Sequence, residues 1–147
     1  MTIKMYSPKY RDDMLFMVLS AKDALGLVPT LREDLLDIPH EYFKKGDSFW
    51  ITVDDNDRVI GCLGYHVVSD TDAFLHRFYV KPALKRKGIG TALLQHVEQE
   101  LWQRGIKTVH VHLGGPKEVW YESYAFYAKQ GFIEYAPRYW KKTLISA

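Results

Sequence analysis

The feature that most constrains the fold is the segment KPALKRKGIGTALL, residues 81–94, with the run FLHRFYV directly before it at 74–80. The run is rich in β-branched and aromatic residues, which favours a buried strand. Pro82 ends strand pairing because proline has no backbone N–H to donate. From Ile89 onward, apolar residues recur at helical spacing. The segment therefore predicts a strand, a basic glycine turn and a helix in succession.

The turn has the chemistry of an anion site. It consists of three cations and a glycine-containing tetrapeptide: Lys85, Arg86, Lys87, Gly88, Ile89, Gly90 and Thr91. Glycine lets the backbone approach a ligand closely, and the first N–H groups of a helix have no internal acceptor. These groups and the positive helix end favour a phosphate or pyrophosphate. The spacing matches neither GxxxxGK[ST] nor GxGxxG, because Leu93 stands at the third glycine position. A plain tight turn with a solvated basic face is the alternative.

Residues 80–94 resemble the cofactor-binding motif of the GNAT N-acetyltransferase superfamily, Gln/Arg-x-x-Gly-x-Gly/Ala after a strand and a V-x-P step. AFYAKQGF at 125–132 is similar to the family's FYxKxGF segment. The two motifs occur in the family's order and at its usual separation, and the resemblance spans most of the chain. Lys85 departs from the usual Arg or Gln, and Trp120 stands where many members have Asn. The first departure suits a site built from backbone amides, whereas the second affects one side-chain contact with the pantetheine arm.

Length and composition set the broad class. The chain has 147 residues, of which 47% are hydrophobic and 14% aromatic, as expected of a single packed domain spanning 1–147. A net charge of +2 gives no argument for a nucleic-acid partner. No apolar run reaches the roughly 20 residues of a membrane span, and the N-terminus has no signal-peptide core. The single cysteine, Cys62, excludes an internal disulfide and favours a reducing cytoplasm.

The remaining pattern alternates strands and helices. We expect strands at 2–6, 47–53, 58–68, 108–113, 132–135 and 139–144, and helices starting at Ser7-Pro8 and covering 31–44, 89–103 and 119–130. Gly26 and Pro29 break the chain before the 31–44 helix, and Thr30 is its expected cap. This order predicts a mixed α/β sheet flanked by helices. The GNAT resemblance implies the same fold, with strands four and five splayed around the cofactor.

Some polar and small residues have two interpretations. The 31–44 helix carries Glu33, Asp34, Asp37 and Glu41, which form either a solvated face or a negative wall that attracts a cationic amine. Gly61 and Gly64 mark a bulge or a close approach by a ligand. Cys62 has no helix N-terminus or cation beside it in sequence, so we expect a small buried hydrophobe and no nucleophile.

The resemblance implies transfer of an acetyl group from acetyl-CoA to a primary amine of a small molecule or a peptide. Attack is expected to be direct, in a ternary complex, because no activated cysteine is evident. Where the fourth strand leaves its neighbour, the backbone of Phe78, Tyr79 and Val80 is expected to pair with the pantetheine arm. Pairing within the sheet is the alternative.

The proton of the amine needs an acceptor, because an alkylamine has a pKa of about 10. Many family members place a Glu near the start of the fourth strand, where this chain has Phe74. Period-two alternation predicts His76 on the same strand face as Phe74, Phe78 and Val80. Imidazole has an unperturbed pKa of about 6.5 and can take a proton directly or through water. We therefore predict His76 as the base, with a hydrogen-bonded core histidine as the alternative.

The leaving thiolate needs a proton donor. Tyr127 occupies the position where many family members keep a tyrosine as general acid, and a phenol is protonated at pH 7. A core aromatic is the alternative role, and Tyr124, one helical turn earlier, is the nearest substitute.

Three further expectations complete the set. His110 and His112 share a strand face, but no third ligand stands at helpful spacing, so we expect no metal. A GNAT-like module that binds acetyl-CoA or regulates without turnover is the alternative to an enzyme. If the chain associates with itself, we expect a homodimer formed through the aromatic C-terminal hairpin.

Overall fold

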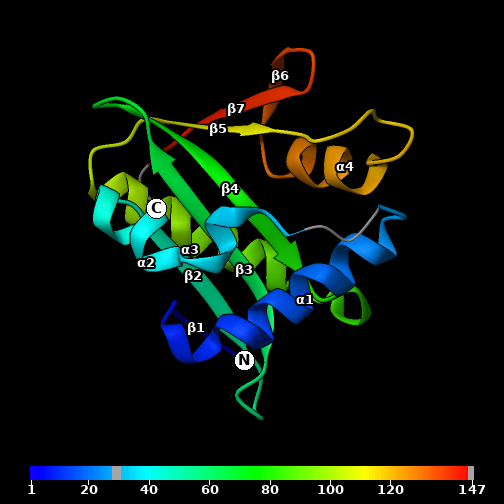
Figure 1. The fold of residues 1–147 in the computed structure, drawn as a ribbon. Helices are drawn as coiled ribbons and strands as arrows, with labels where there is room; N and C mark the ends of the chain where they lie inside the picture. The colour runs from blue at the N-terminus through cyan, green and yellow to red at the C-terminus, as the bar shows by residue number, and fades with distance from the viewer. Residues whose placement is uncertain (28–30, 146–147) are drawn as a thin grey trace.

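The computed structural model describes residues 1–27 and 31–145. In this part of the chain, seven strands form one sheet in the order β1-β2-β3-β4-β5-β7-β6 (Figure 1). The strands are β1 (Thr2–Met5), β2 (Ser48–Val53), β3 (Val59–Val67), β4 (Asp72–Val80), β5 (Thr108–His112), β6 (Ile133–Ala136) and β7 (Tyr139–Thr143). The helices are α1 (Arg11–Ala24), α2 (Ile38–Glu41), α3 (Ile89–Gln103) and α4 (Tyr121–Lys129), with 3-10 turns η1 (Pro8–Tyr10), η2 (Glu33–Leu36), η3 (Phe43–Lys45) and η4 (Pro82–Leu84). The predicted mixed α/β fold is confirmed.

Helices cover both faces of the sheet and bury two apolar cores. On one face, Met14 of α1 and Ile38 of α2 pack with Phe49 of β2. On the other, Leu93 of α3 and Tyr127 of α4 belong to the second core. We call these the α1/α2 face and the α3/α4 face.

The segment from residue 31 to 45 is not one helix, so the predicted 31–44 helix is wrong. It contains η2, the four-residue α2 and η3. Pro39 lacks an N–H and disfavours a helical residue before it, and Asp37 adopts φ −144° and ψ 70° between the two pieces. The expected breaker Pro29 and cap Thr30 lie outside the described residues. At the first helix, Ser7 makes no side-chain cap and η1 comes before α1.

β4 and β5 form the parallel pair of the sheet and separate early. Their register covers Asp72↔Thr108, Ala73↔Val109 and Phe74↔His110. Figure 1 shows the two strands diverging beyond this pairing. From residue 75 onward, the edge of β4 that faces β5 has no neighbouring strand, within the described part of the chain, to take its hydrogen bonds. The predicted splay of strands four and five is confirmed.

A β-bulge interrupts β4 at the same level. The register between β3 and β4 shifts between Cys62 and Gly64, and Arg77 adopts φ 57°. A bulge adds one residue to one strand, so the side chains beyond it change face. His76 therefore contacts His66 near Tyr42 on the α1/α2 face, whereas Phe78 packs on the α3/α4 face. The prediction that His76, Phe78 and Val80 share a face is wrong.

Candidate active site

The basic glycine turn leads directly into α3, as predicted. Gly88 is the N-cap with φ 83°, and Arg86 also has a positive φ of 65°. The first helical hydrogen bond runs from the Ala92 N–H to the Gly88 carbonyl. The N–H groups of the first helical turn, including those of Ile89 and Gly90, therefore have no acceptor within α3. This arrangement can bind an anion through backbone donors.

Two of the predicted cofactor-binding side chains have partners on α4. Lys85 Nζ lies 3.4 Å from Glu122 Oε2 near the start of α4. Thr91 Oγ1 accepts a hydrogen bond of 3.2 Å from the Gln130 amide at its other end. These contacts connect α4 to the turn along its length, so the helix is held beside the free edge of β4.

Gly90 faces the space between β4 and α4. A Cβ at this position would lie 3.6 Å from Val80 Cγ2 and 3.7 Å from the Phe126 ring, which are ordinary contact distances. One methyl group therefore fits at this position, whereas a branched side chain would enter the space between Val80 and Phe126. Phe78 also faces α4, with its ring centroid 5.7 Å from that of Phe126.

Tyr127 and Tyr124 differ in what their hydroxyl groups do. The Tyr124 hydroxyl donates to the Gly115 carbonyl at 3.0 Å. The Tyr127 hydroxyl has no hydrogen-bond partner among residues 1–27 and 31–145. Burial raises the pKa of Tyr127, so the phenol remains protonated at neutral pH. Of these two tyrosines, Tyr127 is therefore the one with an unbonded hydroxyl, and its ring packs against Phe78 of β4.

His76 directly precedes the bulge on the α1/α2 face. Burial lowers the pKa of His76 to about 4, and the neighbouring His66 adds to the effect. The ring is therefore neutral at pH 7, so it can accept a hydrogen bond, but it holds a proton poorly. The sequence predicted His76 as the base, with a core histidine as the alternative, but it did not predict how far burial lowers the pKa.

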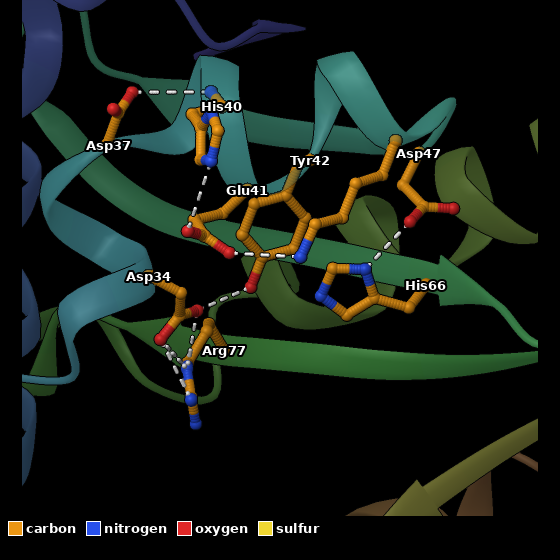
Figure 2. Close-up of polar contacts among 9 residues, drawn as sticks. Asp34, Asp37, His40, Glu41, Tyr42, Asp47, His66 and Arg77 are labelled. Carbon is orange, nitrogen blue, oxygen red and sulfur yellow. Dashed lines mark hydrogen bonds and ion pairs between the residues drawn. The ribbon is translucent and has the colours of Figure 1, made fainter.

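An ion pair holds the bulge, and sequence reasoning did not find it. Arg77 donates to both carboxylate oxygens of Asp34 at 3.0 Å, and the Tyr42 hydroxyl donates to Asp34 at 2.7 Å (Figure 2). Burial opposes ionisation of Asp34, but the Arg77 and Tyr42 bonds outweigh it and lower the pKa. Gly64 makes room for Tyr42, because a Cβ there would lie 2.9 Å from its ring. No local sequence signal connects these three segments.

The other acidic residues of this region are also engaged. Asp37 accepts the His40 N–H at 3.3 Å, and Glu41 lies 3.1 Å from Lys45 Nζ. Asp34 pairs with Arg77. Of the predicted negative wall, Glu33 and Asp37 have no ion pair among the described residues, and Asp37 instead caps α2, so the group mainly serves the structure of the segment.

The remaining candidates have structural partners. Cys62 is buried, as predicted, and burial raises the pKa of its thiol to about 12. His110 Nε2 lies 2.7 Å from Asp72 and its Nδ1 lies 3.0 Å from the Tyr135 hydroxyl. His112 stacks on Tyr139. Within residues 1–27 and 31–145, no three His, Cys, Asp or Glu residues gather as a metal site.

Comparison with known proteins agrees with this geometry. The acetyltransferase (GNAT) family profile matches residues 16–132. A GNAT-family acetyltransferase of Staphylococcus aureus Mu50 is similar with a TM-score of 0.85 and 19% identity, covering 98% of this chain and 99% of that one. An aminoglycoside 6'-N-acetyltransferase in complex with coenzyme A has a TM-score of 0.70 and 18% identity, covering 100% and 99%. The ribosomal-protein alanine N-acetyltransferase of Escherichia coli has a TM-score of 0.77 and 19% identity, covering 99% and 95%.

No curated protein matches the chain. None of the helices in the described residues is long and apolar enough to cross a membrane. The profile covers well over half of the sequence and includes both motifs, the splayed strands and α4. This chain therefore belongs to the GNAT acetyltransferase family.

Proposed function

We propose that this protein transfers the acetyl group of acetyl-CoA to a primary amine by direct attack in a ternary complex. The observation that carries the proposal is the free edge of β4 between the amide-lined start of α3 and the unpartnered hydroxyl of Tyr127. Related folds include one solved with coenzyme A, which supports the same donor here.

The α3/α4 face serves the donor in this proposal. Backbone N–H groups of the turn from Arg86 to Thr91 hold the pyrophosphate. The backbone of Phe78, Tyr79 and Val80 pairs with the pantetheine arm, because this edge of β4 has no neighbouring strand. Tyr127 then gives its proton to the departing thiolate as the C–S bond breaks.

The α1/α2 face serves the acceptor. The amine must lose a proton before its lone pair can attack the acetyl carbon. His76 lies beside the bulge and has a neutral ring at pH 7, so it can orient the amine or a water molecule and pass the proton on through water. Similar folds act on aminoglycosides and on a protein alanine, which makes both kinds of amine suitable candidates.

A panel of primary amines tests the proposal. Spermidine, an aminoglycoside and a peptide with an N-terminal alanine would each be incubated with the protein and acetyl-CoA, and thiol release measured. We expect at least one amine to increase thiol release strongly over acetyl-CoA alone. Tight acetyl-CoA binding without amine-dependent release would favour the alternative of a binding or regulatory module.

Homodimerisation is a separate proposal, supported by the exposed apolar residues of the C-terminal hairpin. Ile133 is 71% exposed and Tyr135 is 44% exposed. Sedimentation at increasing protein concentration tests it. A sedimentation coefficient that stays at the monomer value would remove the dimer.

A further inference from the structure

The ring of His66 is fixed on the α1/α2 face between two other rings. His66 stacks on Tyr42 with centroids 4.5 Å apart and an interplanar angle of 15°. The His76 ring lies edge-on to it, with centroids also 4.5 Å apart. Because His76 directly precedes the bulge in β4, this arrangement places a second imidazole next to the predicted acceptor side of the site.

A buried carboxylate determines which nitrogen of His66 carries the hydrogen. Asp47 Oδ2 lies 2.7 Å from His66 Nδ1 (Figure 2). Asp47 Oδ1 accepts the Val67 N–H at 2.9 Å. A carboxylate only accepts hydrogen bonds, so Nδ1 carries the hydrogen and the lone pair is on Nε2. Among residues 1–27 and 31–145, Nε2 has no hydrogen-bond partner.

Among the described residues, a carboxylate contacts the His66 ring, whereas none contacts the His76 ring. The charged groups that act on the His76 ring are Arg77 of β4, Asp34 of η2 and Asp47, and Tyr42 stacks on the His66 ring. Asp34 is already paired with Arg77, whereas the ionic partner of Asp47 is His66 itself. A proton on His66 therefore forms an ion pair with Asp47, while one on His76 would be buried without a carboxylate bond.

Building on the acetyl transfer proposed above, we propose that His66, oriented by Asp47, is the residue that receives the proton of the acceptor amine, through water. The ammonium N–H bond breaks and an N–H bond forms at His66 Nε2. The neutral amine then forms the bond to the acetyl carbon, and the C–S bond breaks. The second amine proton ends on sulfur by way of Tyr127. The side chain of His66 is 24% exposed, so its proton can pass to solvent after each turnover.

Asp47 acts as a positioning residue, since it fixes the tautomer and orientation of His66 without touching the amine. His76 is the neighbour that packs edge-on against the His66 ring and is neutral at pH 7. In this assignment the proton goes to His66 of β3 and not to His76. Asp47, the residue before β2, only holds the His66 ring in place.

The chain contains a matched control in His110. Its ring also has a carboxylate oxygen at 2.7 Å, from Asp72, and stacks on an aromatic ring, that of Phe74. Both of its nitrogens are occupied, because Tyr135 takes the second one. His110→Asn therefore repeats the loss of a stacked, carboxylate-bonded imidazole without removing a free lone pair.

The experiment compares His66→Asn with His110→Asn, using the amine that gives the fastest thiol release with the wild-type protein. Asn can still donate to Asp47 but cannot take up a proton. We expect His66→Asn to lose turnover by about 10²-fold at pH 7 and to lose the acidic limb of the pH–rate profile. Its rate should approach that of the wild type as the pH nears the amine pKa of about 10, because the amine then needs no acceptor. His110→Asn should keep the wild-type turnover at pH 7 and the acidic limb of the pH–rate profile.

Melting temperature and acetyl-CoA affinity, measured on the same samples, separate folding from chemistry. If His66→Asn does not fold, Asp47→Asn replaces it, since the amide oxygen can still accept the Val67 N–H but no longer fixes the tautomer. A folded variant with full turnover and an unchanged limb would overturn the assignment to His66. A limb that disappears in His76→Gln instead would also overturn it. An inactive wild-type protein would remove the proposed function and, with it, this assignment.

Discussion

The two faces of β4 are built from different chemical groups. On the α3/α4 face, the proposed donor site depends on backbone N–H and C=O groups, which the splay and the start of α3 leave free. On the α1/α2 face, the proposed acceptor site depends on side chains held in pairs, Asp34 with Arg77 and Asp47 with His66. The bulge at Arg77 separates the two sets, because it turns His76 to one face and Phe78 to the other. A backbone-built site tolerates many sequences, whereas a side-chain site depends on particular residues.

Among substitutions on the two faces, Tyr127→Phe is expected to cause the largest loss of turnover. This substitution removes the proposed proton donor and keeps the ring that packs against Phe78. Turnover should fall by about 10²-fold or more, with acetyl-CoA affinity little changed. Tyr124→Phe is the matched control, because it removes a hydroxyl already bonded to Gly115 from the same helix. Full turnover by folded Tyr127→Phe would exclude the tyrosine as the acid.

Substitutions at Gly90 should act on the donor alone. Ala places a methyl group at ordinary contact distance from Val80 and Phe126, whereas Val adds branches to the space between them. Overpacking there costs about 1–3 kcal/mol, equivalent to roughly five- to 150-fold in acetyl-CoA affinity. Calorimetry should show weaker binding by Gly90→Val than by Gly90→Ala, with both proteins folded. Equal affinities would mean that the donor does not pass this point.

On the acceptor face, the burial of His76 should appear as a pH dependence of stability. The pKa of His76 is about 4 in the folded protein, below the unfolded value of about 6.5. The unfolded chain therefore binds more protons between these values, and stability is lost as the pH falls through this window. Between pH 7 and pH 5, the wild type should lose about 2 kcal/mol more free energy of unfolding than His76→Gln. His40→Gln, on a ring 59% exposed, provides the control. Parallel curves for His76→Gln and the wild type would contradict the assigned burial.

The smallest expected effect is that of breaking the ion pair at the bulge. Asp34→Asn leaves Arg77 without its carboxylate, but the Arg77 side chain is 26% exposed and retains some contact with water. We expect a loss of about 1–2 kcal/mol in the free energy of unfolding. Asp12→Asn removes an exposed pair with Arg11 and should cost less than about 0.5 kcal/mol. Chemical denaturation of both variants compares the two, and equal losses would show that Asp34 does not stabilise the bulge.

The sequence predicted the α3/α4 face better than the α1/α2 face, and the reason is physical. The glycine turn, the start of α3 and Tyr127 lie within two local motifs, and local spacing was sufficient to place them in the fold. The bulge at Arg77 has no such signal, because an Arg with φ 57° is held there by Asp34 from a distant segment. The strand-face error at Phe78 follows from that bulge.

The side chains proposed for the acceptor site were missed for a related reason. His66 and Asp47 come from β3 and from the residue before β2, and only the sheet brings them together. Neither residue lies in a motif, and an isolated histidine on a strand does not indicate its tautomer. The broken 31–44 segment, which supplies Tyr42, was hidden because its acidic and apolar pattern resembles a helix.

Direct transfer between the two faces is the central claim, and one measurement tests it most directly. The wild-type protein would be incubated with acetyl-CoA, then given its fastest amine, while mass spectrometry follows the protein and the amine together with free coenzyme A. The account predicts no acetylated protein before the amine is added, and afterwards equal amounts of acetylated amine and released coenzyme A. Acetyl-CoA binding without any acetylated amine, or an acetylated protein that forms first and then reacts, would contradict it.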